Sequence, residues 1–151
     1  MVLIVGAVYV FGRHQGGSNN WGQVKKLNPM GVDAGDYFGS SVGISADTLV
    51  VGAYGHHSCG TDCGAAYVFG WNEEGSNGWG QVKKLNPGKV WDYFGVSVSV
   101  SGDTVLVGSR GEDSCGSDCG AAYVFGRNHG EPINDWGTSE EADSKCWKCW
   151  G

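Results

Sequence analysis

Proline, long apolar runs and excess positive charge are all missing from this sequence. Only 3 of the 151 residues are Pro whereas 28 are Gly, a balance that suits many tight turns rather than long helices. No apolar run approaches the roughly 18 residues of a membrane-spanning helix, so we expect no transmembrane segment. Lys and Arg number 10 against 16 Asp and Glu, which gives a formal charge of −6. Because phosphate recognition needs a basic surface, we expect no nucleic-acid partner.

The chain opens on an apolar stretch, MVLIVGAVYVFG, with the length of a signal-peptide core but no Lys or Arg before it. Its last seven residues, GAVYVFG at 6–12, return as GAAYVFG at 64–70 and at 120–126. The stretch is therefore interpreted as the first copy of a repeated element. Any export signal is expected upstream of this sequence, or is missing.

Comparison of the chain with itself shows a repeat of 56–58 residues. WGQVKKLNP at 21–29 recurs unchanged at 79–87, and DYFGSSVGISADTLVVGA at 36–53 matches DYFGVSVSVSGDTVLVGS at 92–109. A period of this length without helical periodicity favours propeller blades of four antiparallel strands. We therefore predict blade repeats over residues 1–136, followed by a divergent polar tail, rich in Cys and Trp, at 137–151.

Four strands are expected in each complete repeat. Residues 93–101 alternate apolar and small polar side chains with period two, which is typical of a half-buried strand. The apolar runs at 104–108 and 65–69 predict the second and third strands. The last strand, 79–85, carries two lysines and is expected at the exposed outer edge, where Lys disfavours pairing with another sheet.

Two segments resemble FG-GAP repeats. One has Tyr37-Phe38-Gly39 followed by LVVGA at 49–53, and the other has Tyr93-Phe94-Gly95 followed by VLVGS at 105–109. The Phe-Gly pair, the Asp-Thr turn, the Val-Gly run and the Ala-Tyr-Val-Phe strand follow the family's order twice. The resemblance covers nearly the whole chain up to about Trp136. It implies an all-β fold of four-stranded antiparallel β-propeller blades, as in integrin α chains, and a role in extracellular recognition or adhesion.

The repeat register divides the chain into a partial blade at 2–28, a complete blade at 36–87 and a partial blade at 92–136. About two and a half blades do not close a ring, since propellers typically have about 4–8. Both outer blades then present apolar faces that need a cover. The residues expected on such faces are Phe38, Val42, Phe94 and Val98. The expected partners are further copies of the chain, as a homo-oligomer, or further repeats of a longer propeller.

Calcium is the metal that the resemblance implies, bound by an Asp-rich loop between the first two strands of a blade. Here that position holds Ser45-Ala46-Asp47 in one repeat and Ser101-Gly102-Asp103 in the other. One carboxylate in a two-residue turn does not supply the 6–8 or so oxygen ligands that calcium takes. We therefore expect no metal and no cofactor.

The six cysteines come in three close pairs. Cys59 and Cys63 occupy the same loop position as Cys115 and Cys119, and a tight turn brings each pair within disulfide reach. Reduced thiols and a zinc half-site stay open as alternatives. The tail pair, Cys146 and Cys149, has CxxC spacing but no helix start, so we expect a terminal disulfide or unpaired thiols rather than a redox site. This cysteine usage favours an extracellular, cell-surface or periplasmic location.

Loops that differ between copies are where a rigid scaffold usually carries recognition. His56 and His57 match Glu112 and Asp113 in the next repeat, and a solvated loop is the simpler interpretation of the His pair. These loops are expected to share one face with the blade-to-blade connections. The candidate ligand-contact residues on that face are Tyr54, His56, His57, Arg110, Glu112 and Asp113. Trp71 and Trp91 are not repeated and are candidates for an aromatic contact surface.

Catalytic motifs are not found: the sequence has no nucleophile elbow, no phosphate-binding glycine loop and no matched pair of acids. The expected function is therefore non-catalytic binding of a protein or glycan through the inter-strand loops. One alternative is a lectin-like propeller in which Trp71 or Trp91 stacks on a sugar ring. Another is a self-assembling fragment with a purely structural role.

Overall fold

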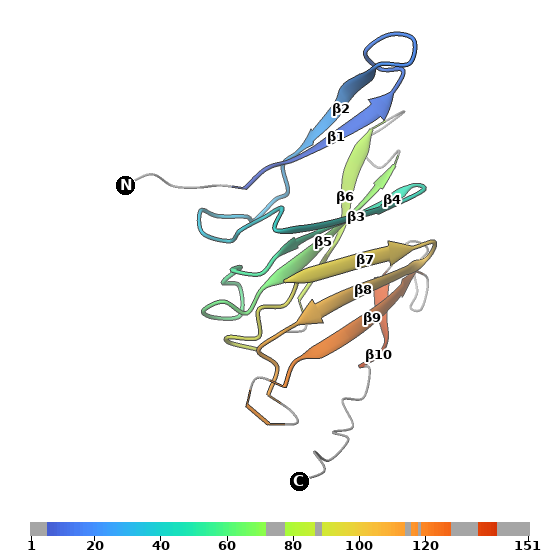
Figure 1. Cartoon of the computed structure of the whole chain (residues 1–151). Coiled ribbons are helices and arrows are strands. Elements are labelled where there is room, and N and C mark those ends of the chain that lie inside the picture. Colours follow the sequence, from blue (N-terminus) through green and yellow to red (C-terminus); the bar gives the residue numbers. More distant parts are fainter. Residues whose placement is uncertain are drawn as a thin grey trace.

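The computed structural model describes residues 6–71, 78–86, 89–113, 116–117, 119–127 and 136–141. These residues form an all-β molecule of three antiparallel sheets that follow one another in chain order (Figure 1). The first sheet pairs β1 (Val8–Arg13) with β2 (Trp21–Leu27). The second contains β3 (Ser41–Ser45), β4 (Thr48–Ala53), β5 (Ala65–Trp71) and β6 (Trp79–Leu85). The third contains β7 (Ser97–Ser101), β8 (Thr104–Ser109), β9 (Ala121–Arg127) and β10 (Trp136–Glu141).

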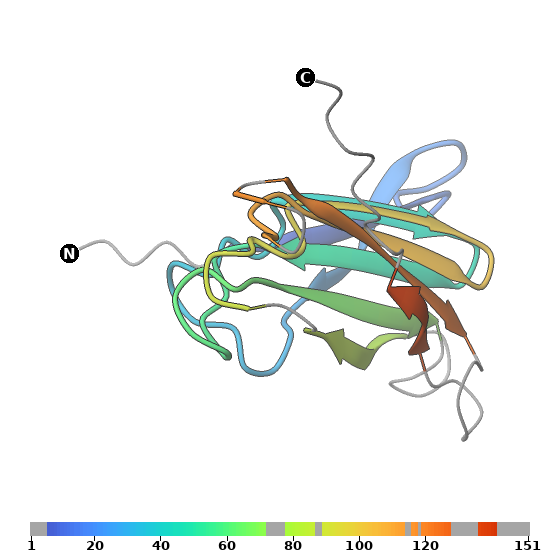
Figure 2. The ribbon, with the colours of Figure 1, turned by 90° about the horizontal axis from the view of Figure 1, so that it is seen from below.

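Each four-stranded sheet is a meander in which sequential strands are hydrogen-bonded neighbours. The inner strands β3 and β7 lie side by side, and each sheet twists from its inner to its outer strand (Figures 1 and 2). The prediction of four-stranded propeller blades without a closed ring is confirmed for the described residues. We call the three sheets blades 1, 2 and 3. No described helix is long and apolar enough to cross a membrane.

The first strand of each complete blade is shorter than expected, because it begins at Ser41 or Ser97 rather than at the preceding Tyr-Phe-Gly. Tyr93 and Gly95 have φ angles of 54° and 89°, in the left-handed region, so these residues form a turn. Alternation alone does not reveal this turn, since a turn residue and a strand residue both satisfy the pattern.

Blade 3 has a fourth strand that the sequence analysis did not predict. β10 pairs with β9 from Trp136 opposite Arg127 to Glu141 opposite Tyr123. The expected polar tail therefore begins inside a strand. Trp136-Gly137 repeats the Trp-Gly that opens β2 and β6, and this dipeptide was the available sign of the strand.

The hydrophobic core lies between blades rather than within one sheet. Alternating side chains point to opposite faces of a blade. We call the face toward the preceding blade the N-side face and the other the C-side face. Between blades 1 and 2, Val10 and Leu27 pack against Leu49, Tyr67 and other N-side residues of blade 2. Between blades 2 and 3, the contact is formed by Val50, Ala66, Val68, Leu85, Phe94, Val105, Val107, Tyr123, Phe125 and Trp136.

Two residues expected on open faces are instead buried in this core. Phe38 and Phe94 are 3% and 0% exposed, because each follows a left-handed Tyr that turns it toward the preceding blade. Val98 packs against the second cluster as well. Of the four expected residues only Val42 is open, with 58% of its surface exposed.

Candidate functional site at the loop end

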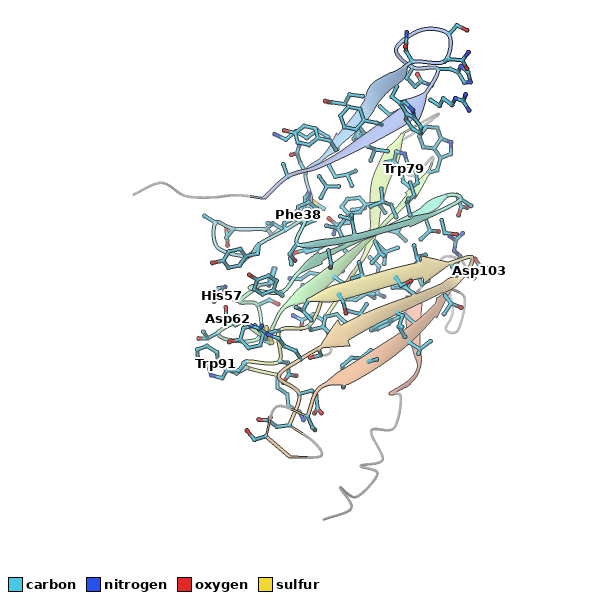
Figure 3. All side chains as sticks on the ribbon, in the orientation of Figure 1. Phe38, His57, Asp62, Trp79, Trp91 and Asp103 are labelled. Carbon is cyan, nitrogen blue, oxygen red and sulfur yellow. A yellow bond between two sulfur atoms is a disulfide. The ribbon has the colours of Figure 1, made fainter. Side chains whose placement is uncertain are left out.

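The β4–β5 loop and the connections between blades lie together at one end of the molecule (Figure 1). The β4–β5 loop contacts the connection before it through the Gly55 N–H, which donates to the Asp36 carbonyl at 3.2 Å. It contacts the following connection through the Trp91 and Tyr93 N–H groups, which donate to the carbonyls of Thr61 and Asp62 at 2.9 Å each. Figure 3 shows His57, Asp62 and Trp91 along this edge. We call it the loop-end surface.

A continuous row of aromatic and guanidinium groups crosses this surface. The rings of Tyr37 and Tyr54 stack with centroids 4.9 Å apart and planes within 5°. The ring centroids of Tyr54 and Tyr93 are 6.4 Å apart. The guanidinium carbon of Arg110 lies over the Tyr93 ring, 4.3 Å from its centroid. The row therefore joins blade 2 to blade 3. We call Tyr37, Tyr54, Tyr93 and Arg110 the tyrosine row.

The repeat explains how the row arises. Tyr37 and Tyr93 occupy the same repeat position, have φ angles of 56° and 54°, and project outward while the next residue is buried. Tyr54 and Arg110 also occupy one repeat position, directly after β4 and directly after β8. Tyr54 and Arg110 were among the candidate ligand-contact residues, whereas Tyr37 and Tyr93 were not, and Tyr93 was expected in a strand. Their recurrence before an invariant Phe-Gly was the available sign.

Exposed aromatic surface continues beyond the row. Tyr37 is 53% exposed, and Trp91, in the connection between blades 2 and 3, is 54% exposed. Trp91 is held by its backbone bond to Thr61 rather than by packing of its ring in the core. Both rings thus offer open area at fixed positions.

Trp71 does not belong to this surface. It ends β5 at the opposite end of the blade, where its N–H donates to the Asp47 carbonyl at 2.9 Å. Its ring packs edge-to-face on Trp79 with centroids 5.5 Å apart. The structure therefore separates the two tryptophans that the sequence analysis paired as candidates.

His56 lies under the loop-end surface and not on it, with only 5% of its surface exposed. The Ser58 N–H donates to its Nδ1 at 3.0 Å, and its Nε2 lies 2.9 Å from the Gly31 carbonyl oxygen. The Asp36 carboxylate lies 3.7 Å from the same Nε2, and Lys84 Nζ lies 2.9 Å from it. Burial lowers the pKa of the Lys84 amine, and Asp36 opposes that shift.

The same position in blade 3 holds a carboxylate in place of the imidazole. Glu112 is 2% exposed, and its carboxylate pairs with Lys89 Nζ at 3.7 Å. The Lys89 N–H donates to the buried Asp92 carboxylate at 2.6 Å, as the Asp33 N–H donates to Asp36. At one junction the loop contributes an imidazole and the connection a carboxylate, whereas at the other the loop contributes a carboxylate and the connection an ammonium group. His56 therefore does not lie in a solvated loop, as the interpretation of the His pair had it, and Glu112 is not an exposed contact residue: both side chains are buried between a loop and a connection.

The neighbours of these two residues face outward. The His57 side chain is 53% exposed, with Nδ1 3.4 Å from Asp36 and Nε2 3.7 Å from Asp62. Asp113 is exposed, and its carbonyl accepts the Gly116 N–H at 3.2 Å. His57 and Asp113 therefore remain accessible beside the tyrosine row.

The expected disulfide between Cys59 and Cys63 is present, with their Cα atoms 6.0 Å apart. It closes the loop that carries His57 and Asp62, and Cys63 is fully buried. Cys119 is also disulfide-bonded, whereas Cys115, its expected partner, lies outside the described residues. Cys146 and Cys149 lie outside them too.

The turns where calcium was considered do not fit that ion. The carboxylates of Asp47 and Asp103 lie 3.1 Å and 3.2 Å from the guanidinium of Arg127, so a fixed cation already stands between them. In the described part of the chain, no group of three or more His, Cys, Asp or Glu side chains is arranged to hold a metal.

Comparison with known proteins identifies a family. The model of the FG-GAP repeat family matches residues 21–69 and 79–125. Each match starts in the outer strand of one blade and ends in the third strand of the next, so the matched unit spans a blade junction. No curated protein matches the chain.

Proposed function

Because this chain belongs to the FG-GAP repeat family, we propose that it is a non-catalytic extracellular module that binds a protein or glycan at its loop-end surface. The tyrosine row is the observation that carries the proposal. It spans two blades, contains Tyr and Arg, and continues into exposed area at Tyr37 and Trp91. Tyr, Trp and Arg are the residues that most often dominate binding energy at protein interfaces.

The scaffold under the row supports binding because it holds the loops in one conformation. The Cys59–Cys63 disulfide closes one loop, and buried pairs at His56 and Glu112 fix both loops to the connections. A preorganised surface loses less conformational entropy when a ligand binds. FG-GAP repeats are generally non-catalytic, and an extracellular location suits a module stapled by disulfides.

A glycan is the second candidate ligand, and Trp91 favours it. An exposed indole that is fixed by its backbone provides a stacking face for a sugar ring. The Asp62 carboxylate, on the loop that the Trp91 N–H contacts, is available to accept sugar hydroxyl groups. Trp71 gives no support to this candidate, because its ring packs against Trp79.

Binding to a glycan array and to an array of secreted and cell-surface proteins tests the proposal. Tyr37→Ala should weaken binding of a protein ligand at least tenfold, since it removes the open end of the row. Trp91→Ala should do the same for a glycan. Ile44→Ala is the matched control, because Ile44 is 60% exposed but lies on the inner strand β3. Saturable binding that neither variant changes, or no saturable binding on either array, would refute the proposal.

A further inference from the structure

We infer that copies of this chain associate head to tail, with the C-side face of blade 3 in one copy packed against the N-side face of blade 1 in the next. The partner is a second copy of the chain, and the surface is separate from the loop-end surface. The inference does not depend on the proposed function.

The internal blade junctions are the template for this contact. At each junction an aromatic N-side face meets an aliphatic C-side face. In blade 2 the aromatic residues are Tyr67, Phe69 and Trp79, which are 0%, 2% and 6% exposed. In blade 3 they are Tyr123, Phe125 and Trp136, which are 6%, 3% and 3% exposed. The chain therefore forms the same kind of contact twice.

Blade 1 carries the same aromatic set with no blade in front of it among the described residues. The strand registers place Tyr9, Phe11 and Trp21 where blade 2 has Tyr67, Phe69 and Trp79. They are 48%, 54% and 67% exposed. Three aromatic side chains on one face of a two-stranded sheet form an apolar patch of the kind that marks an interaction site.

Blade 3 carries the complementary face. Leu106 occupies the position of Val50, and the registers of β8 and β9 place Ala122 and Val124 where blade 2 has Ala66 and Val68. Val50 is fully buried against blade 3, whereas Leu106 is 43% exposed. The exposed aromatic residues of blade 1 and the exposed Leu106 of blade 3 thus correspond to the two halves of a junction that the molecule already contains.

Charge at the rim supports the same orientation. Within the chain, Arg127 of blade 3 donates to the Asp47 carboxylate of blade 2 at 3.1 Å and also contacts Thr48. Arg13 ends β1 as Arg127 ends β9, and it is exposed, donating to Asn19 Oδ1 at 3.2 Å. Asp103 follows β7 as Asp47 follows β3; its carboxylate lies 3.2 Å from Arg127 Nε, and its side chain is still 74% exposed. Head-to-tail packing would bring Arg13 of one copy to Asp103 of the other.

This contact joins two different surfaces, so it is heterologous and either closes into a ring or continues as a filament. Each copy contributes three blade positions. Two copies would supply six, which falls within the 4–8 or so blades of closed propellers. A closed pair of chains is therefore the expected product.

Light scattering coupled to size-exclusion chromatography, over a series of micromolar concentrations, tests the inference. The unmodified chain should show a mass that rises with concentration from 15.9 kDa toward twice that value. Phe11→Asp destroys the N-side face and Leu106→Asp the C-side face, so each variant alone should stay at 15.9 kDa. Met30→Asp is the control, because Met30 is 81% exposed in a connection and should leave association unchanged.

Mixing the two variants distinguishes this arrangement from others. Phe11→Asp keeps an intact C-side face and Leu106→Asp an intact N-side face, so the mixture should form a pair that neither forms alone. Arg13→Glu is a milder surface change that leaves both apolar faces intact. It should weaken self-association of the chain about tenfold, because it removes the contact with Asp103 of the other copy. Melting curves establish that each variant is folded. A monomer at every concentration, association of either variant alone, or no pair in the mixture would overturn the inference.

Discussion

Arg127 shows how much a single side chain contributes to the junction of two blades. Its guanidinium reaches Asp47 in blade 2, lies 3.2 Å from Asp103 in its own blade and covers the Trp136 ring at 5.3 Å. The hydrogen bond from Arg127 holds the pKa of the Asp47 carboxyl below its usual range, and the Thr48 hydroxyl acts in the same direction.

This pKa shift predicts a pH dependence of stability. Because the folded-state pKa of Asp47 is lowered, its contribution is fully present above the unfolded value of 3.8 and is lost as the pH falls through the folded-state value. The carboxylate is 60% exposed, so solvent screening keeps the coupling small, about 0.5 kcal/mol. A double-mutant cycle of Asp47→Asn and Arg127→Gln, measured by urea unfolding, should show this coupling at pH 7.

The same cycle at pH values below 3 supplies the check. Protonation removes the charge of Asp47, so the coupling free energy should shrink toward zero there. A coupling that stays constant from pH 7 to pH 2 would show that the contact does not depend on the carboxylate charge.

The two inner strands β3 and β7 have the same residue pattern but contribute differently to the free energy of unfolding, because different segments pack against them. β3 and β7 occupy the same place in blades 2 and 3 and share alternating side chains. Val98 and Val100 of β7 pack against the core between blades 2 and 3, whereas Val42 and Ile44 of β3 are 58% and 60% exposed. An open apolar cavity of about 250 Å³ lies beside β3. It is lined by Val8, Tyr9, Val10, Phe11, Val42, Gly43, Ile44 and Leu49.

We therefore predict opposite outcomes for one substitution at two equivalent positions. Val98→Ala should lower the free energy of unfolding by about 1 kcal/mol, because packed methyl groups are lost. Val42→Ala should change it by less than about 0.5 kcal/mol, as expected for an exposed site. Denaturant unfolding at low protein concentration measures both. Equal losses at the two positions would mean that the cavity beside β3 is covered in solution.

At the scale of the whole molecule, the blades are held by apolar junctions and fixed charges, with no described cluster of metal ligands. Arg127 stands between the two turn carboxylates nearest the position where related repeats would place calcium. The stability of the chain should therefore not depend on added cation.

This leads to a prediction about calcium. Millimolar calcium or a chelator should leave the melting temperature unchanged. An ion that binds the folded chain would raise this temperature by mass action, so an unchanged value indicates that no calcium is bound. Differential scanning calorimetry with magnesium as the matched cation measures the effect. A calcium-specific rise of several degrees would show that oxygen ligands assemble from segments outside the two turns.

The repeat could be derived from the sequence because identical segments at a fixed offset must adopt the same local structure. GAAYVFG at 64–70 and 120–126 marks the same strand in two blades, and the alternation in 97–101 marks a surface covered on one side. The Cys59–Cys63 disulfide was also predictable, since it forms within five consecutive residues and needs only a tight turn. The repeat and the local spacing of residues determined the blades and this disulfide, and the Tyr-Phe-Gly and Val-Gly motifs carried the resemblance to the family.

Only the tertiary structure decided which residues meet. Alternation shows that Phe38 and Tyr37 point in opposite directions, but the neighbouring blade determines that Phe38 is buried and Tyr37 joins a row with Tyr54. His56 and Glu112 look like variable loop residues until their partners, Asp36 and Lys89, are seen on a different segment. The polar partners of these buried side chains lie about twenty residues away in the chain, and a local sequence pattern does not show which distant residues come into contact.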